Sequence, residues 1–243
     1  MQSTDAAIQF DGVRKAFGPI DVLRGLDLSV PVGKLCALVG VNGAGKTTGI
    51  KSLLDFCAVD GGHIEIFGAP HDRPAARERL AFLPERFNPP YFLTGAEYLR
   101  TMATLYSVRF DLSRAESVCD ELEFAIEALQ RPVRTYSKGM AQKLGLAGAF
   151  LSERELLLLD EPLSGLDPKA RILVKRQLRK ACDEGRTVFF TTHMLADLET
   201  ICDLMFMLDG GRCVFAGSVT ALREQFGEID LEAAFLRALT ASD

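Results

Sequence analysis

The sequence predicts an α/β fold built on a mainly parallel β-sheet that helices cover on both faces. Short apolar runs such as LLLL at 156–159 and TVFFTT at 187–192 alternate with longer segments of helical pattern. Uninterrupted apolar runs are typical of strands buried on both faces of a parallel sheet. A glycine-rich loop at 40–47, between one such run and a helix, agrees with this architecture.

The N-terminal third predicts a small antiparallel β subdomain beside the first parallel strand. Residues 8–32 combine short apolar alternations with glycine turns, which indicates antiparallel strands at a sheet edge. KLCALVG at 34–40 predicts a buried strand, and a helix is expected to begin at about Thr47. HIEIFG at 63–68 predicts another short strand.

The middle of the chain predicts a helical subdomain inserted between two strands of the sheet. Residues 70–150 are mostly helical in pattern, and the prolines at 89–90 interrupt them, so we expect the insertion to span about 86–150. The apolar strands at 156–159 and 187–192 should lie side by side, with the amphipathic helix KARILVKRQLRKACDEG between them in sequence. Another helix follows, and then DLMFML and RCVFAG, joined by Asp-Gly-Gly, form a hairpin.

The last residues, 226–243, predict an amphipathic helical tail after a main domain at 1–225. Apolar side chains recur at the spacing i, i+3, i+4, i+7 and i+8; they are Leu231, Ala234, Phe235, Ala238 and Leu239. Its polar face carries few basic residues, which argues against membrane contact. Two surfaces remain open for this helix, its own domain and a sister subunit.

Composition and charge exclude several classes of protein. The net charge is -5, so we expect no nucleic-acid partner. The uncharged run at 35–45 is far shorter than the ~20 residues that a membrane-spanning helix needs, and the N-terminus lacks a secretory pattern. The 6 cysteines include no C-x-x-C pair, which favours reduced thiols in the cytosol.

The loop GVNGAGKT, Gly40 to Thr47, matches the phosphate-binding pattern G-x-x-x-x-G-K-[ST]. Gly43 and Gly45 let the backbone turn its N–H groups toward phosphates, and Lys46 reaches the outer ones. The hydroxyl of Thr47 can ligate Mg²⁺. The sequence therefore predicts a P-loop NTPase.

Three further polar residues follow two of the apolar strands. Asp160 and Glu161 come directly after LLLL, and adjacent residues of a strand point to opposite sides, so Asp160 can hold the Mg²⁺ shell while Glu161 faces the attacking water. His193 follows TVFFTT, at the strand end where parallel sheets bind ligands. We expect it to contact the outermost phosphate and orient the water.

A second anion site is predicted in TYSKGMAQKL at 135–144. Ser137 and Gly139 stand at the start of a helical segment, where unpaired N–H groups and the helix dipole favour an anion. The residues alone do not explain why one chain needs two phosphate sites.

Over residues 8–225 these motifs, in this order, resemble the nucleotide-binding subunit of ATP-binding-cassette (ABC) transporters. GVNGAGKT resembles the Walker A loop, LLLLDE the Walker B strand with its catalytic glutamate, and YSKGM the signature. SGLD, Ser164 to Asp167, resembles the D-loop, and His193 the switch histidine. Phe17 stands where the family stacks an aromatic ring on adenine.

The resemblance implies a function for the second anion site. Family members pair head to tail, so the signature of each subunit covers the ATP in the other's Walker loop. The implied cofactors are ATP and Mg²⁺, and the implied catalytic residues are Glu161 and His193. The implied nucleotide contacts are Phe17, Gly40, Asn42, Gly43, Ala44, Gly45, Lys46, Thr47, Thr48, Ser137, Gly139 and Asp167. The implied metal ligands are Thr47, Glu85 and Asp160.

The resemblance also implies partners and a location. The partners are an integral membrane permease and a second cassette, identical or diverged, at the cytoplasmic face of the cell membrane. YSKGM departs from the usual L-S-G-G-Q, and Glu85 replaces the usual glutamine; both variants are similar to those of bacterial exporters and favour export. Phe87, Tyr91 and Phe92 would line a groove for a short permease helix.

Two other functions compete with this interpretation. A soluble ABC ATPase of DNA repair, translation or cofactor assembly shares the motifs, but those acting in repair or translation generally carry a long coiled-coil insertion or two cassettes. A small-molecule P-loop kinase would explain 40–47, but not the signature stretch, the D-loop or His193.

Overall fold

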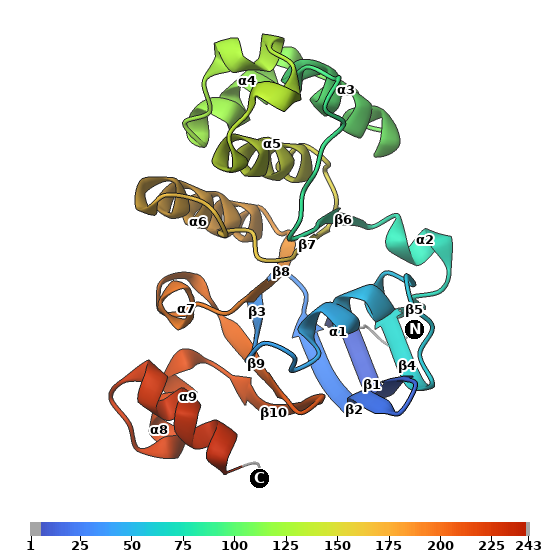
Figure 1. Cartoon of the computed structure of the whole chain (residues 1–243), viewed down its shortest axis with the longest axis vertical. Helices are drawn as coiled ribbons and strands as arrows, with labels where there is room; N and C mark the ends of the chain where they lie inside the picture. The colour runs from blue at the N-terminus through green and yellow to red at the C-terminus, as the bar shows by residue number, and fades with distance from the viewer. Residues whose placement is uncertain (1–5, 242–243) are drawn as a thin grey trace.

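The computed structural model describes residues 6–241, whose strands form two sheets (Figure 1). The larger sheet has 6 strands in the order β10-β9-β3-β8-β7-β6, and all neighbours are parallel except β9 and β10. Its strands are β3 (Leu35–Val39), β6 (Leu80–Leu83), β7 (Leu156–Leu159), β8 (Thr187–Thr192), β9 (Leu204–Asp209) and β10 (Arg212–Gly217). The expected α/β fold with a mainly parallel core sheet is confirmed, and β7 pairs with β8 as predicted.

The smaller sheet is antiparallel and has the order β2-β1-β4-β5. Its strands are β1 (Ala6–Phe17), β2 (Ile20–Pro31), β4 (Gly61–Ile66) and β5 (Ala69–Pro70). The expected N-terminal antiparallel subdomain is confirmed, and its strands form a sheet of their own instead of extending the edge of the parallel sheet. One face of β1 and β2 packs against β3 in a hydrophobic core that the two sheets share.

Each face of the parallel sheet has its own hydrophobic core, because successive side chains of a strand point to opposite faces. Cys36 and Leu38 of β3 pack with the antiparallel sheet and with α1 (Lys46–Leu53). Leu35, Ala37 and Val39 point to the other face, which packs with helices that include α6 (Pro168–Asp183) and α7 (Leu195–Ile201). Burial on both faces explains why these strands read as continuous apolar runs.

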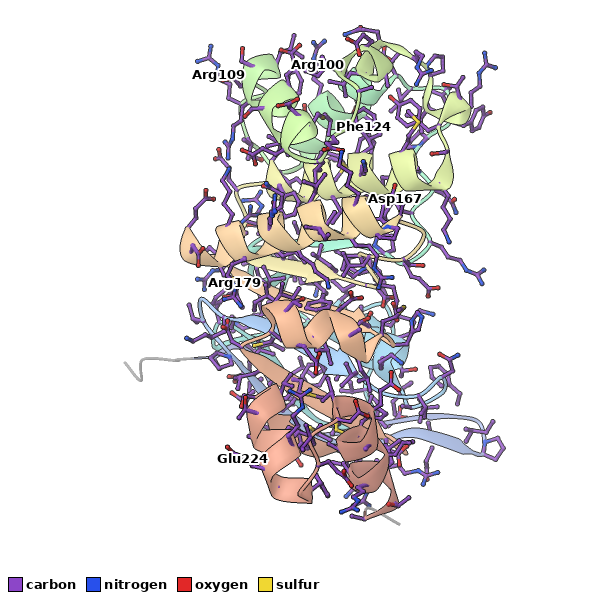
Figure 2. The ribbon with its side chains drawn as sticks, turned by 90° about the vertical axis from the view of Figure 1, so that its left-hand side faces the viewer. Arg100, Arg109, Phe124, Asp167, Arg179 and Glu224 are labelled. Carbon is purple, nitrogen blue, oxygen red and sulfur yellow. The ribbon has the colours of Figure 1, made fainter. Side chains whose placement is uncertain are left out.

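A helical block lies between β6 and β7 in sequence and at one end of the molecule in space (Figure 1). It contains α3 (Gly95–Leu105), α4 (Leu112–Glu121), the 3-10 turns η1 (Ile126–Gln130) and η2 (Val133–Thr135), and α5 (Lys138–Phe150). Thr94 starts α3 with a capping box, in which it exchanges hydrogen bonds with Glu97. Figure 2 shows Arg100 and Phe124 in this block, above the long helix α6.

The helical pattern at 70–150 hid one strand of the sheet. After the short helix α2 (Pro74–Arg77), residues Leu80–Leu83 form β6, the edge strand beside β7. A run of four apolar residues is too short to show either the period of a strand or that of a helix, so it could not be recognised as a strand within a region of helical pattern. This strand places Glu85 at the same edge of the sheet as Asp160.

The chain ends in two helices, α8 (Val219–Phe226) and α9 (Leu231–Thr240), which pack on each other and on β10. Helix α9 buries the four side chains Leu231, Ala234, Phe235 and Ala238 in the core of this domain. Of the two surfaces left open for the tail, the structure shows the chain's own domain. Within residues 6–241, no helix has the length and apolar character needed to cross a membrane.

Candidate functional site

A cavity of ≈ 480 Å³ opens at the carboxyl ends of β3, β7 and β8. Parallel sheets bind ligands at this edge because the loops and helix N-termini that follow the strands converge there. Its lining residues are Val22, Asn42, Gly43, Gly45, Lys46, Thr47, Thr48, Glu85, Asp160, Glu161, Ser164 and His193. Ten of the sequence-predicted site residues are in this set, and they come from segments far apart in the chain.

Glycines shape the loop after β3. A β-carbon at Gly40 would lie 2.3 Å from the carbonyl oxygen of Leu208, so no larger residue fits between β3 and β9. Gly43 and Gly45 have φ of +88° and +110°, which L side chains rarely adopt. The loop then enters α1 directly, and its N–H groups stand at the positive end of that helix. This arrangement suits phosphate.

Lys46 supplies the positive charge at the bottom of the cavity. Its Nζ donates hydrogen bonds to the carbonyl oxygens of Gly40 (2.6 Å) and Val41 (3.2 Å). Burial lowers the pKa of Lys46, and the neighbouring carboxylates of Glu161, Asp160 and Glu85 oppose that shift. Those carboxylates favour the charged form of the ammonium beside the place where the loop would hold phosphates.

Asp160 and Glu161 are held in place through one hydroxyl group, that of Thr191 in β8. The Thr191 hydroxyl donates to the Asp160 carboxylate (2.5 Å) and accepts from the Glu161 backbone N–H (2.9 Å). Asp160 is 7% exposed, and burial raises its pKa while the Thr191 hydrogen bond lowers it. Glu161 has φ of +49°, a left-handed conformation, and its carboxylate contacts His193, whereas the Asp160 carboxylate contacts Thr191. The two carboxylates can therefore serve different ligands.

His193 contacts Glu161 directly. Nδ1 of His193 lies 2.9 Å from Oε1 of Glu161, and because an ionised carboxylate can only accept, Nδ1–H is the donor. Burial raises the pKa of Glu161, and the hydrogen bond from His193 is the main influence that lowers it. A carboxylate with a raised pKa, aimed by a second side chain, is suited to accept a proton from water.

The donor set around Thr47, Asp160 and Glu85 fits Mg²⁺. All three line the cavity, and they offer one hydroxyl and two carboxylates. Within residues 6–241 no group of three His, Cys, Asp or Glu side chains could hold a metal ion by itself. Mg²⁺ usually binds through one or two carboxylates plus the phosphates of a nucleotide, so this set is sufficient for an ion that arrives with its nucleotide.

The structure does not bring every predicted site residue to this cavity. Phe17 is 49% exposed at the end of β1, where Nζ of Lys15 lies 5.4 Å from its ring centroid. Ser137 caps α5, its hydroxyl accepting from the Met140 N–H (3.2 Å), and it lines a separate groove of ≈ 860 Å³. Gly139 lies in the first turn of α5.

Three other predicted contacts also lie outside the cavity lining. Asp167 caps α6, accepting from the Ala170 N–H (2.9 Å), and Figure 2 places it at the end of that helix opposite Arg179. Gly40 and Ala44 belong to the phosphate loop; Ala44 is 3% exposed and packs in the core under it.

Sequence reasoning missed the contributions of three residues. Val22 of β2 lines the cavity, and nothing in the pattern of that strand indicates it. Ser164 lines it too, although the sequence analysis quoted it only as part of the D-loop. Thr191 links Asp160 to Glu161; a hydroxyl at the end of an apolar strand, two residues before His193, was the available signal.

Comparisons with known proteins identify the family. The ABC transporter family profile matches residues 23–164. The chain is 36% identical over 203 residues to an uncharacterised ABC transporter ATP-binding protein of Synechocystis sp., covering 82% of this chain and 57% of that protein. It is 36% identical to a Nod factor export ATP-binding protein of Paraburkholderia xenovorans (90% and 73%) and 34% identical to a daunorubicin resistance ATP-binding protein of Streptomyces coeruleorubidus (92% and 72%).

Solved structures agree. The ATP-binding subunit of an ABC transporter superposes with a TM-score of 0.87 at 30% identity, covering 96% of this chain and 99% of that one. An ATP-bound bacterial exporter of the Atm1 family shares the fold, with a TM-score of 0.82 at 22% identity, and 42% of its chain is covered. The chain spans 57% and 61% of the length of two cyanobacterial relatives. With the P-loop, the acidic pair and the histidine gathered in one cavity, these matches show that the chain belongs to the ABC transporter ATP-binding proteins.

Proposed function

We propose that the protein hydrolyses ATP as the nucleotide-binding subunit of an ABC exporter. It would pair head to tail with a second cassette around two ATP molecules and drive a separate membrane permease from the cytoplasmic face of the cell membrane. The observation that carries the proposal is the division of the site. Lys46, Asp160, Glu161 and His193 meet in one cavity, whereas Ser137 lines another groove of the same chain.

A head-to-tail pair explains this division. The Ser137 hydroxyl and the N–H groups at the start of α5 form an anion site without the lysine and carboxylates that hydrolysis needs. Placed against the cavity of a second cassette, they would add donors to the outer phosphate that the first chain cannot supply. Each chain would then contribute half of two sites, and an isolated chain would bind ATP but hydrolyse it slowly.

The residues of the cavity would divide the chemistry among them. The loop N–H groups and Lys46 hold the phosphates, and Thr47, Glu85 and Asp160 hold Mg²⁺, which neutralises charge on the phosphate oxygens when bound. Glu161 accepts the proton of the attacking water. His193 fixes the Glu161 carboxylate through the 2.9 Å hydrogen bond and leaves its other ring nitrogen for the outer phosphate.

Contact with the permease would occur at the ≈ 860 Å³ groove, which begins where the nucleotide cavity ends. Glu85 lines both spaces. Tyr91 lines the groove and is 69% exposed. Phe92 is 68% exposed and packs edge-on against the Tyr91 ring, but it is not part of the groove lining. Exposed aromatic side chains beside a groove are typical of a surface that accepts an apolar helix. A change at Glu85 on nucleotide binding would therefore reach the permease.

The direction of transport is proposed from the relatives. The chain covers 73% of a protein named for Nod factor export and 72% of one named for daunorubicin resistance. The first name states export of a compound, and the second states resistance to one. The cargo itself would be recognised in the permease.

Two experiments test the proposed function. Purification of the chain from its native cells in mild detergent, followed by mass spectrometry, should recover a multi-helix membrane protein with it. The purified chain should hydrolyse ATP, and Glu161→Gln should lower kcat by about 100-fold or more while ATP still binds. Only soluble co-purifying proteins, with the chain absent from membranes, would favour the soluble ABC ATPases. Wild-type turnover by Glu161→Gln would remove Glu161 from the role of base.

A further inference from the structure

Helix α5 contacts the segment that follows Glu161 through two side chains one helical turn apart. The Gln142 amide, 5% exposed, donates to the carbonyl oxygen of Pro162 (3.0 Å). One turn earlier, the stem of Lys138 lies over Gly165: a β-carbon built on Gly165 would be 2.9 Å from its Cε and 3.1 Å from its Cδ. Because residues i and i+4 share a helix face, both contacts belong to one surface of α5.

The contact depends on the shape of the segment. Gly165 has φ of +74°, and the Lys138 stem occupies the space where another residue would carry its side chain. A β-carbon at Gly139 would lie 3.4 Å from the carbonyl oxygen of Gly165, so the next residue of the signature stretch also approaches the same turn. The start of α5 therefore packs closely on this turn, and the methylene groups of Lys138 fill the space between them.

The same segment forms part of the chain's own nucleotide cavity. Ser164 lines that cavity together with Glu161, and the Ser164 N–H donates to the Glu161 carbonyl oxygen (3.0 Å). A displacement of Gly165 would move Ser164, its neighbour, and through this hydrogen bond the backbone of Glu161. The position of Lys138 is thus linked to the position of the proposed base by contacts within one chain.

We propose that Lys138 is a positioning residue that couples the two ATP sites of the dimer through its apolar stem. Ser137 and Gly139 on either side of it would contact the partner's nucleotide, while its methylene groups hold Gly165 and Ser164 against the chain's own site. Binding of ATP in one site would then order the base of the other. The inference rests on the head-to-tail dimer of the proposed function. The positioning of Gly165 and Ser164 is assigned to the methylene groups of Lys138, not to its ammonium group.

Two substitutions separate the stem from the charge. Lys138→Met keeps a long apolar side chain without charge, and Lys138→Ala removes both while preserving helix propensity. The first readout is amide hydrogen exchange of the peptide covering 162–167 in the full, nucleotide-free chain, which requires no dimer. Lys138→Ala should speed exchange there about tenfold, and Lys138→Met should leave it unchanged. Equal exchange rates in the wild type and in Lys138→Ala would show that the contact does not stabilise residues 162–167, and the proposal would be wrong.

The second readout is steady-state hydrolysis as a function of ATP concentration. Lys138→Ala should lower kcat about tenfold and reduce the Hill coefficient toward 1, with the Kd for ATP unchanged, because a misplaced base slows chemistry without weakening binding. Lys138→Met should keep kcat within about twofold and keep the cooperativity. If Lys138→Met is as slow as Lys138→Ala, the ammonium acts on the partner's phosphate and the proposal is wrong.

A failure of the proposed function would look different. Glu161→Gln chains that bind ATP without forming dimers in sedimentation would refute both the dimer and the coupling, even if the exchange results were as expected. Dimers that form normally, combined with unchanged cooperativity in Lys138→Ala, would refute the coupling alone. Slow hydrolysis and lost cooperativity in Lys138→Ala only, with dimers intact, supports the proposal.

Discussion

Replacing Asp197 with alanine should destabilise the protein more than replacing any other charged residue of α7. The Asp197 carboxylate is 4% exposed, accepts a hydrogen bond from Arg171, and lies 2.8 Å from Nζ of Lys175. Both cations belong to α6, so this one carboxylate joins the helix that follows the D-loop to the helix that follows His193. Its removal leaves two positive charges without a carboxylate partner, although Lys175 keeps its hydrogen bond to the Thr200 hydroxyl (3.1 Å).

The size of the effect follows from the burial of the three side chains. Breaking a fully buried ion pair costs about 3–5 kcal/mol, because the remaining charge loses its partner without regaining water. The side chains of Arg171 and Lys175 are 23% and 17% exposed, so both recover part of their hydration. We therefore expect the free energy of unfolding to fall by about 2–3 kcal/mol in Asp197→Ala. Asp197→Asn, which keeps an acceptor oxygen, should lose less.

Urea unfolding followed by far-UV circular dichroism measures this loss, as a shift of the midpoint at unchanged slope. Glu199→Ala is the matched control on the same helix. Its partner is Arg223, and the two side chains are 40% and 34% exposed, so its removal should cost less than about 1 kcal/mol. Equal losses in Asp197→Ala and Glu199→Ala would refute the argument that burial makes the Asp197 contacts strong.

Three further predictions concern the site. Gly40→Ala would place a β-carbon 2.3 Å from the Leu208 carbonyl oxygen, so it should lower stability by about 1–3 kcal/mol and weaken ATP binding in calorimetry. Burial raises the pKa of Glu161, so kcat should rise with pH through a value above the ordinary ~4.3 of a glutamate. Because the His193 hydrogen bond lowers that pKa, this limb should move to higher pH in His193→Ala; a limb that stays in place would argue against the contact. The free energy of unfolding of Phe92→Asp should lie within about 0.5 kcal/mol of the wild-type value, since Phe92 is 68% exposed, yet the variant should fail to couple hydrolysis to transport; normal coupling would argue against the exposed aromatic pair beside the groove as a permease contact.

Most strands of the parallel sheet could be predicted because a strand buried on both faces is apolar at every position, and such a run is visible in the sequence. LLLL and TVFFTT are apolar at every position, and they became the paired strands β7 and β8. The strand β6 was not predicted, although LAFL is also apolar at every position, because the helical pattern assigned to the whole of 70–150 left this run of four residues ambiguous between strand and helix. The antiparallel subdomain was predicted as well, because alternation in β1 and β2 indicates one buried face, although that alternation does not show what covers the face.

In the site, the spacing of the phosphate-binding motif located the residues of the loop at 40–47. Their positions directly after apolar strands located the carboxylates of Asp160 and Glu161, and also His193. What the sequence could not show were contacts between strands. The Thr191 hydroxyl joins Asp160 to Glu161 only because β8 lies beside β7, and Val22 reaches the cavity from the other sheet. The contact of Lys138 with Gly165 likewise depends on how α5 packs on the turn after Glu161.

The central claim is that each ATP site combines the P-loop of one chain with the signature stretch of another. Its most direct test mixes two variants of the full chain, Lys46→Ala, which disables the loop, and Ser137→Arg, which blocks the signature. Each alone should be inactive. An equal mixture should regain activity that neither variant has alone, at most about a quarter of the wild-type value, because about half of the dimers are mixed and each has one intact site out of two. Loss of the coupling between the sites would lower that value further. A mixture as inactive as its components, beside an active wild-type chain, would contradict the shared site.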